Sequence, residues 1–191
     1  MIAADRTLLV LLAAGQSTRF GTADKLAVEV GGKALALHPV AALADINFID
    51  RVAVVAGTRV DFAAHGYRTV TNFAPELGLS GSLRLGVQVA QNMGAAALLV
   101  ALADMPCVTP AHFAALLAAA DGARAIIASC DGARAMPPAV FGAGQFTALA
   151  RVMGDNGGRA LLQNARKIAA PAGSLVDIDT PSDLAALRRD R

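Results

Sequence analysis

A length of 191 residues predicts one domain, residues 1–191, that can bury a substantial core. The composition is 55% hydrophobic and 17% charged, but no apolar run reaches the roughly 18 residues of a membrane-spanning helix. A net charge of +2 with 4% aromatic residues argues against a nucleic-acid partner, and two cysteines without metal-ligand spacing favour a reducing cytoplasm.

The first predicted element is an apolar strand at residues 8–14. It lacks the alternation of a half-exposed strand, which indicates burial on both faces of a parallel sheet. A loop that contains Gly15, Arg19, Gly21 and Lys25 follows it. Ligands bind beyond the carboxyl ends of such strands, and glycines let backbone amides approach a phosphate. We therefore expect a polyphosphate-binding loop here.

The spacing within this loop excludes two better-known phosphate loops. Five residues separate Gly15 from Gly21, whereas a P-loop has four between its glycines and then Lys-Ser or Lys-Thr. A dinucleotide fingerprint needs glycine where this chain has Ser17. A secretory signal is a competing interpretation of the apolar run, but Asp5 spoils the positive flank that such a signal needs.

The next part of the chain alternates helical and strand patterns, as in a parallel α/β sheet. The expected segments are a helix at 34–44, a buried strand at 51–56, a short helical stretch around 60–64 and a strand at 68–71. Ser80 or Ser82 can cap the helix that follows, in which Leu83, Val87 and Ala90 recur at helical spacing.

The most hydrophobic predicted strand, residues 95–103, runs directly into Asp104. A carboxylate at this point lies at the same sheet edge as the glycine-bearing loop. Mg²⁺ takes one or two carboxylates together with waters and substrate phosphates, so Asp104 is the best magnesium candidate. The alternative is an aspartate that only turns the chain before Pro106.

Two helix starts are predicted in the remaining sequence. Thr109 is the expected N-cap of a helix at 111–120, in which His112 has no evident role. Thr180 is the expected N-cap of a C-terminal helix, with Asp183 three residues later. Between them, the sequence Asp-Gly-Ala-Arg-Ala occurs at 121–125 and 131–135 and brackets a strand at 125–129. The second Asp-Gly predicts a hairpin turn into a strand that ends at Phe141.

Five motifs together resemble a known enzyme superfamily. The run from Leu12 to Lys25 resembles the Leu-Ala-Ala-Gly-x-Ser-x-Arg-x-Gly-x-x-x-Lys signature of nucleotidyltransferases, and looks most like that of the molybdenum cofactor cytidylyltransferases. Four later segments are similar to phrases of the same family: 78–86 to Gly-Met-Ser-x-Ser-Leu-x-x-Gly, 102–106 to Leu-x-Asp-x-Pro, 154–159 to Gly-Asp-x-Gly-Ala-Arg, and 177–184 to Asp-Ile-Asp-Thr-Pro-x-Asp-Leu.

The resemblance implies a fold and a reaction. The implied fold is a single-domain, Rossmann-like three-layer α/β sandwich with a mostly parallel sheet and a β-hairpin excursion. The implied reaction is Mg²⁺-dependent transfer of CMP from CTP to the terminal phosphate of the molybdopterin cofactor, with release of pyrophosphate. A molybdoenzyme would receive the product, and neither nucleic acid nor membrane would take part.

The resemblance also implies roles for individual residues. The implied nucleotide-binding residues are Leu12, Ala13, Ala14, Gly15, Gln16, Ser17, Arg19, Lys25, Gly78, Ser80, Ser82 and Asp104. Arg19 and Lys25 are the expected catalytic residues, while Asp104 and Asp179 are the expected metal ligands, with Asp177 as the alternative to Asp179. The expected acceptor-binding residues are Pro138, Phe141, Asp155 and Arg159.

Two aspects of specificity stay open at the level of sequence. Ala14 stands where the guanylyl branch of the family has glycine, which favours a cytosine base. Residues 135–141 depart from the family's Gly-x-Pro-Val-Leu-Phe, so the acceptor is less certain than the chemistry. The alternatives are a nucleotidyltransferase that acts on a sugar or polyol phosphate, and a non-catalytic carrier or insertion chaperone for the molybdenum cofactor.

Overall fold

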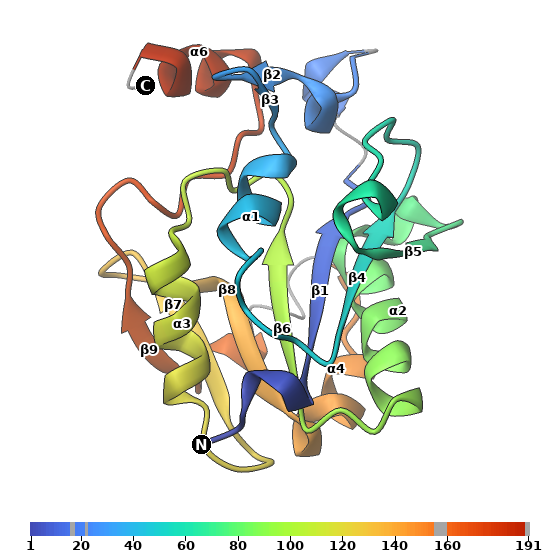
Figure 1. The fold of residues 1–191 in the computed structure, drawn as a ribbon, viewed down its shortest axis with the longest axis vertical. Helices are drawn as coiled ribbons and strands as arrows, with labels where there is room; N and C mark the ends of the chain where they lie inside the picture. The colour runs from blue at the N-terminus through green and yellow to red at the C-terminus, as the bar shows by residue number, and fades with distance from the viewer. Residues whose placement is uncertain (16–17, 22, 155–159, 190–191) are drawn as a thin grey trace.

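Seven strands form one sheet in the order β5-β4-β1-β6-β8-β7-β9 in the computed structural model, which describes residues 1–15, 18–21, 23–154 and 160–189 (Figure 1). The strands are β1 (Thr7–Ala13), β4 (Asp50–Val55), β5 (Arg68–Thr71), β6 (Ala97–Leu102), β7 (Ile126–Cys130), β8 (Ala135–Gly142) and β9 (Arg166–Ala169). Strand β8 runs antiparallel to β6 and β7, whereas the other described neighbours in the sheet are parallel. The predicted α/β class with a mostly parallel sheet is confirmed.

The central strand β1 shows why the sheet has this arrangement. All seven of its residues are buried, as its unbroken apolar sequence predicts for a strand covered on both faces. It pairs in parallel with β4 on one side and with β6 on the other, so that Leu12 lies beside Val54 and Leu102. The carboxyl ends of β1 and β6 therefore meet at one edge of the sheet.

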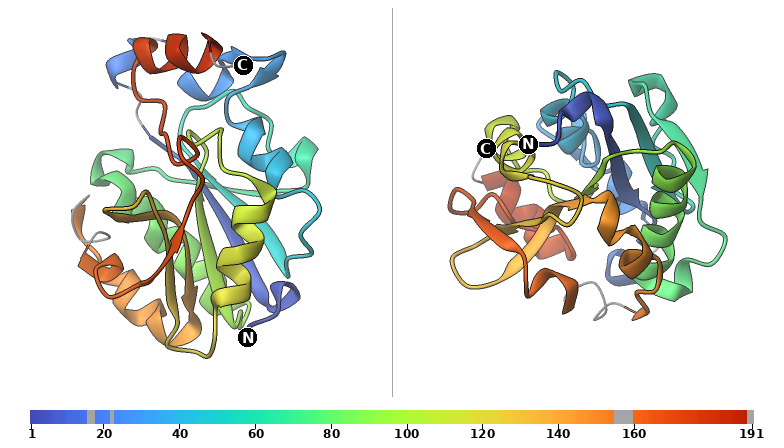
Figure 2. Two further views of the ribbon diagram at one scale, coloured as in Figure 1. Left: turned by 90° about the vertical axis from the view of Figure 1, so that its left-hand side faces the viewer. Right: turned by 90° about the horizontal axis from the view of Figure 1, so that it is seen from below.

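Helices cover both faces of the sheet (Figure 2). The helices are α1 (Leu37–Ala42), α2 (Gly78–Asn92), α3 (Pro110–Ala119), α4 (Phe146–Ala150) and α6 (Pro181–Arg189). Helices α1 and α3 lie over one face and enclose a core that includes Val40, Phe113 and Leu116, whereas α2 and α4 enclose a second core on the other face. These three layers match the predicted sandwich. No helix in the described part is long and apolar enough to span a membrane.

A two-stranded sheet lies beside α6 at one end of the molecule (Figure 1). It consists of β2 (Glu29–Val30) and β3 (Lys33–Ala34). The turn between them uses Gly31 and Gly32 at φ values of 57° and 75°, which side-chain-bearing residues rarely adopt. The helix predicted from residue 34 begins only at Leu37, because Ala34 belongs to β3 and a turn at residues 35–36 follows it.

The predicted caps have mixed outcomes. Thr109 accepts a hydrogen bond from the His112 amide at 3.2 Å, and Thr180 and Asp183 form a reciprocal capping box, so both predictions are confirmed. Neither Ser80 nor Ser82 is an N-cap, since α2 begins before them at Gly78 and residue Leu77 provides no side-chain cap.

Short 3₁₀ turns occupy Ala4–Arg6, Thr18–Phe20, Lys25–Ala27, Ala63–His65, Pro75–Leu77 and Ala143–Gln145.

The predicted hairpin excursion is part of the main sheet. Both of its strands, β7 and β8, are members of the seven-stranded sheet, and β8 lies between β6 and β7. Its connecting turn is fixed by Asp131, whose carboxylate accepts hydrogen bonds from the amides of Ala133 and Arg134.

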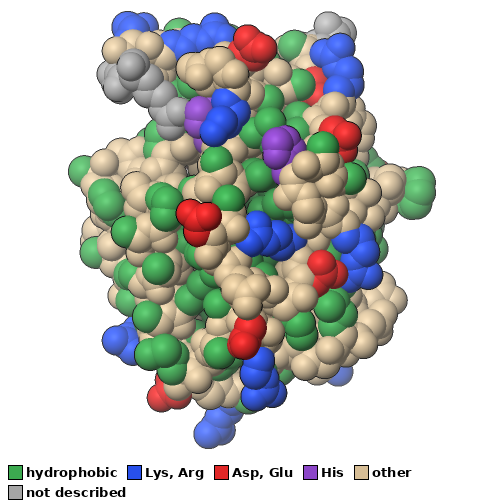
Figure 3. Space-filling model, viewed as in Figure 1, with side chains coloured by type: hydrophobic (Ala, Val, Ile, Leu, Met, Phe, Trp, Pro, Cys, Tyr) green, Lys and Arg blue, Asp and Glu red, His purple; other side chains and the backbone are tan. Residues whose placement is uncertain are grey.

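The face that carries α1 and α3 shows positive and negative side chains interspersed (Figure 3).

Candidate active site

A cavity of about 1110 Å³ lies at the carboxyl ends of β1 and β6. One wall is formed by the chain after β1, by Pro75 and Glu76 of the 3₁₀ turn before α2, and by Gly78 at the start of α2. The opposite wall comes from β8 and from the turn that precedes it. Figure 1 shows the chain after β6 and the segment that leads into α6 at the same end of the sheet. The cavity therefore occupies the expected ligand-binding edge of an α/β sheet.

The centre of this site is the ammonium group of Lys25. Lys25 Nζ donates hydrogen bonds to Asp104 Oδ2 at 2.9 Å and to Asp179 Oδ1 at 3.1 Å. The Lys25 side chain is only 6% exposed, against 24% for Asp104 and 43% for Asp179. Three charged groups that are far apart in the sequence thus meet in one partly buried cluster.

The position of Asp179 follows from the packing of its neighbour Ile178. The Ile178 side chain is 1% exposed, in a small core with Val30 and Leu35, and its amide donates to the Asp104 carbonyl at 3.0 Å. Both flanking aspartates, Asp177 and Asp179, line the cavity. Of the two, Asp179 is the one that contacts the Lys25 ammonium.

Lys25 is held by a residue that sequence reasoning did not select. Asp24 caps the 3₁₀ turn that begins at Lys25, accepting from the Leu26 amide at 3.1 Å. Its second oxygen accepts from Thr58 Oγ1 at 2.9 Å and from the Arg59 amide at 2.7 Å. Asp24 therefore ties the Lys25 turn to the loop after β4. The helix-capping preference of aspartate is the only sequence signal that could have indicated it.

Burial and neighbouring charges act in opposite directions on this cluster. Burial by itself would lower the pKa of Lys25, but the Asp104 and Asp179 carboxylates outweigh it, so the pKa of Lys25 is raised. Burial raises the pKa of Asp104, and the Asp179 and Asp177 charges add to that effect while Lys25 opposes it. Lys25 therefore remains a cation throughout the physiological pH range.

Arg19 contributes a second, more exposed cation. Arg19 Nη1 lies 3.4 Å from Asp179 Oδ2, with side chains 69% and 43% exposed. Such an exposed pair adds little to stability and leaves the guanidinium able to turn toward an anionic ligand.

The wall formed by α2 has its own hydrogen-bond network. Asn72 Nδ2 donates to Ser82 Oγ at 3.0 Å, and Ser80 Oγ donates to the Leu77 carbonyl at 3.0 Å. Ser82 lines the cavity, whereas Ser80 does not. Asn72 is buried and was missed from sequence, because it lies just beyond β5 and outside any recognised motif.

The cavity brings together most of the predicted site residues that the structure describes. Those that line it are Leu12, Ala14, Gly15, Arg19, Lys25, Gly78, Ser82, Asp104, Phe141 and Asp179. Ala13, Ser80 and Pro138 are not among its lining residues. Gln16, Ser17, Asp155 and Arg159 lie outside the described residues.

The wall opposite α2 contains residues that the sequence did not single out. They are Arg134, Gln163 and Lys167, which come from the hairpin turn, from the chain before β9 and from β9 itself. Met136 and Pro137 of β8 also line this wall and belong to the segment 135–141 that the sequence compared with a family phrase. Only the folded sheet places these separate segments around one cavity, so no local motif predicts that Arg134, Gln163 and Lys167 lie together.

The two carboxylates that contact the Lys25 ammonium lie close enough together to bind a divalent cation. Asp104 and Asp179 supply oxygen ligands, which Mg²⁺ prefers, and Mg²⁺ commonly binds with one or two carboxylates plus substrate phosphates. The described residues contain no group of three or more His, Cys, Asp or Glu side chains arranged to hold a metal. The donor set therefore fits a metal that arrives with a phosphate ligand better than a fully protein-coordinated ion.

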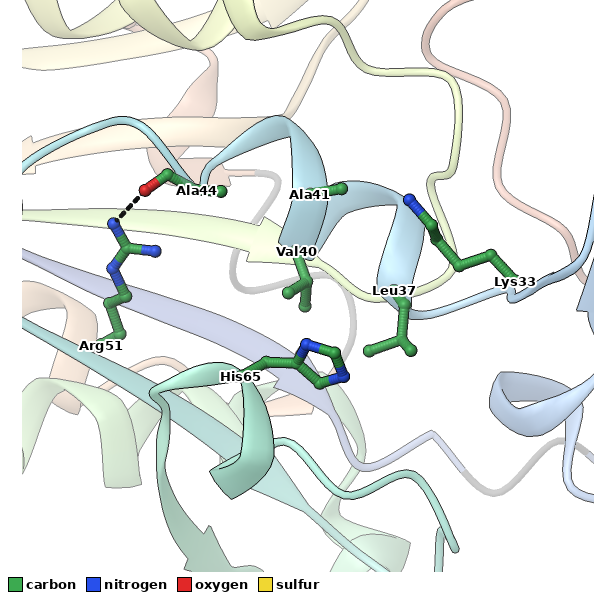
Figure 4. A pocket seen from close by; sticks show the side chains of 7 residues that line it. All are labelled: Lys33, Leu37, Val40, Ala41, Ala44, Arg51 and His65. Carbon is green, nitrogen blue, oxygen red and sulfur yellow. Dashed lines mark hydrogen bonds between the residues drawn. The ribbon is translucent and has the colours of Figure 1, made fainter.

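A smaller cavity of about 290 Å³ lies between α1 and the chain that leads to His65 (Figure 4). Its lining is mostly apolar, with Leu37 and Val40 among it. The guanidinium of Arg51 at its edge donates to the carbonyls of Ala44 and Ile46 at 2.8 and 2.6 Å. Arg51 is therefore engaged by the chain that follows α1, and Lys33 and His65 are the other charged or titratable residues of the lining.

Comparison with known proteins places the chain in a family. Residues 9–169 match the model of the MobA-like NTP transferase domain. The chain is 32% identical to the purine catabolism protein PucB of Bacillus subtilis over 94% of this chain and 95% of that one. It is 34% identical to a probable molybdenum cofactor guanylyltransferase of Pyrococcus horikoshii over 55% of this chain and 52% of that one.

A solved structure shows the same architecture. The homologue of Mycobacterium tuberculosis Rv0371c from Mycobacterium sp. strain JC1 is 26% identical and superposes with a TM-score of 0.78, covering 98% of this chain and 99% of that one. The family match spans β1 to β9 and includes the turn of Lys25 and the strand that ends before Asp104. The chain therefore belongs to the MobA-like NTP transferase domain family and is a nucleotidyltransferase.

Proposed function

We propose that this nucleotidyltransferase transfers CMP from CTP to the terminal phosphate of molybdopterin and releases pyrophosphate. The observation that carries the proposal is the Lys25 ammonium held between Asp104 and Asp179 in the cavity at the carboxyl ends of β1 and β6. The relative described as a probable molybdenum cofactor guanylyltransferase, matched over 55% of this chain, supports an acceptor of this class. The acceptor phosphate oxygen would attack the α-phosphorus as the bond to the pyrophosphate oxygen breaks.

The reaction requires little acid or base chemistry. A phosphate monoester is already ionised near neutral pH, so the attacking oxygen has no proton to lose. The main obstacle is the repulsion between an anionic nucleophile and the anionic triphosphate. Catalysis should therefore consist of positioning and charge neutralisation, which explains why the site relies on Lys25 and Arg19 and needs no histidine.

Different residues of the site would position the triphosphate and neutralise its charge. The chain after β1, beginning at Gly15, and the Arg19 guanidinium would hold the β- and γ-phosphates. Lys25 would stabilise the charge that develops at the α-phosphate. Asp104 and Asp179 would hold Mg²⁺, which when bound neutralises phosphate charge and orients the triphosphate. For Lys25 to reach a phosphate, its ammonium would exchange at least one carboxylate for that anion.

The choice of base depends on the wall beside β1. Ala14 is buried and lines the cavity, and its methyl group occupies space that a glycine would leave open. This favours the smaller cytosine ring over guanine. Since one relative is a probable guanylyltransferase, CTP and GTP must be compared directly.

The decisive experiment supplies each of the four nucleoside triphosphates with Mg²⁺ and molybdopterin, and identifies the product by mass. The expected product is molybdopterin carrying CMP, formed with CTP and lost when EDTA removes the metal. A product with GTP alone would overturn the base assignment. A product formed only with sugar or polyol phosphates would replace the acceptor, and cofactor binding without pyrophosphate release would identify a carrier.

A further inference from the structure

The β8 wall of the cavity contains an irregularity at two adjacent prolines. Consecutive residues Ala128 and Ser129 of β7 pair with Ala139 and Met136 of β8, so the register shifts between them. The segment Pro137–Pro138 is therefore left without partners in the ladder, and neither proline has an N–H to donate. Met136 and the first proline line the cavity. The bulge thus gives the wall its shape.

A serine hydroxyl holds this bulge from the neighbouring strand. Ser129 Oγ donates to the Pro138 carbonyl at 2.8 Å, and the Ser129 side chain is completely buried. The side chain supplies a donor at the point where the backbone ladder is interrupted. Because the site is buried, loss of this hydroxyl would remove a hydrogen bond that water cannot readily replace.

His112 completes the chain of hydrogen bonds. Its Nε2 lies 2.8 Å from Ser129 Oγ, and its side chain is 4% exposed. The hydroxyl has a single hydrogen, which it gives to Pro138, so Nε2 must carry the hydrogen that Ser129 accepts. The imidazole therefore orients the hydroxyl and links the first turn of α3 to the bulge.

We propose that His112 and Ser129 are positioning residues for the acceptor half of the cavity, which hold the Met136 wall in the shape that the acceptor contacts. The inference rests on the proposed function, together with the expectation from sequence that Pro138 and Phe141 of β8 belong to the acceptor side. Neither residue lines the cavity, so each acts through Pro138. The nucleotide side, built from the chain after β1 and from α2, does not depend on this hydrogen-bond chain.

The test compares Ser129→Ala, His112→Leu and His112→Gln in the full-length protein. The glutamine amide can donate from nearly the same place as Nε2, whereas leucine keeps similar bulk without a donor. With molybdopterin as acceptor, we expect Ser129→Ala and His112→Leu to raise the acceptor KM about tenfold. A tenfold change corresponds to about 1.4 kcal/mol of binding free energy. The CTP KM and the kcat should stay within about twofold, and His112→Gln should remain near the wild type.

Ser174→Ala is the matched control. Ser174 is also a buried serine, and its Oγ donates to the Pro171 carbonyl at 2.7 Å, but it does not line the cavity. This variant should leave the acceptor KM unchanged. The proposal is overturned if Ser174→Ala raises the acceptor KM as much as Ser129→Ala, or if neither Ser129→Ala nor His112→Leu raises it.

A second measurement separates this inference from the proposed function. If the wild type does not turn over molybdopterin, the proposed function fails, and hydrogen exchange then tests the positioning chain alone. The amides of Ala135, Met136 and residues 139–141 should exchange about tenfold faster in Ser129→Ala and His112→Leu, but not in His112→Gln or Ser174→Ala. Unchanged exchange in the first two variants would refute the inference even in a protein that is active. A thermal melt of each variant establishes that it is folded.

Discussion

The Nζ of Lys25 lies 2.9 Å from Oδ2 of Asp104, although 79 positions separate the two residues in the sequence. Lys25 follows the first strand and Asp104 follows β6, which is hydrogen-bonded to that strand along its length. The contact therefore exists because parallel pairing brings the two carboxyl ends to one edge. It places a cation and an anion together in the cavity, and the proposed chemistry depends on that proximity.

Replacing Lys25 by methionine should remove the charge while keeping most of the buried side-chain stem. We expect pyrophosphate release to fall by roughly 10²- to 10³-fold, because a preorganised charge at the reacting phosphate is lost. The measurement is the initial rate with saturating CTP, Mg²⁺ and acceptor. Lys33→Ala, which removes an exposed lysine of β3, is the control and should keep the wild-type rate. Wild-type turnover by Lys25→Met would exclude a catalytic role for Lys25.

Gly86 permits close contact between α2 and β1. A Cβ atom at this position would lie 2.7 Å from Val10 Cγ1 and 3.0 Å from its Cγ2. Gly86→Ala should therefore lower the free energy of unfolding by about 1–2 kcal/mol, because overpacking outweighs the roughly 1 kcal/mol gain in helix propensity. Urea unfolding measures this change. In a Val10→Ala background both methyl contacts are gone and only the Cβ of residue 10 stays close, at 3.3 Å, so the same substitution should there be nearly neutral.

The hydroxyl of Tyr67 is buried without a hydrogen-bond partner among the described residues. Burial raises the pKa of Tyr67 to about 12, so the group stays neutral. Tyr67→Phe removes an unsatisfied polar atom and keeps the ring that packs near Phe62. The free energy of unfolding should rise by about 1 kcal/mol, as read from the urea midpoint at constant m-value. A marked loss of stability would show that the hydroxyl has a partner in solution.

His112 should make stability depend on pH. Burial lowers the pKa of His112 below its ordinary value, so the unfolded chain takes up the proton first as the pH falls. Its contribution is fully present above the unfolded pKa near ~6.5 and is lost as the pH drops below it, with a slope of at most about 1.4 kcal/mol per pH unit. The measurement is the unfolding free energy of the wild type and of His112→Gln at pH 7.5, 6.5 and 5.5. The difference between the two proteins gives the contribution of His112. A difference that does not vary with pH would contradict the assignment.

Local sequence was sufficient for the features that short stretches control. The unbroken apolar run of β1 predicted a strand buried on both faces, and Thr109 and Thr180 predicted helix starts that the structure confirms. The residues after β1 and Asp104 were predicted to meet, since the ends of parallel strands share an edge. The possibility that Ser80 or Ser82 caps α2 is wrong, because Ser80 donates to a backbone carbonyl and Ser82 bonds to Asn72.

By itself, the sequence determined the fold class, the glycine-bearing loop after β1 and the candidate carboxylates, because strand burial, capping and motif spacing are properties of neighbouring residues. Only the tertiary structure decided that Asp179, and not Asp177, contacts Lys25, and that His112 and Ser129 support the Pro138 bulge. Those contacts join segments that are distant in the chain, and their geometry depends on how the sheet orders its strands and on which side chains the core buries. Such relationships are set by packing in three dimensions, which no single stretch of sequence encodes.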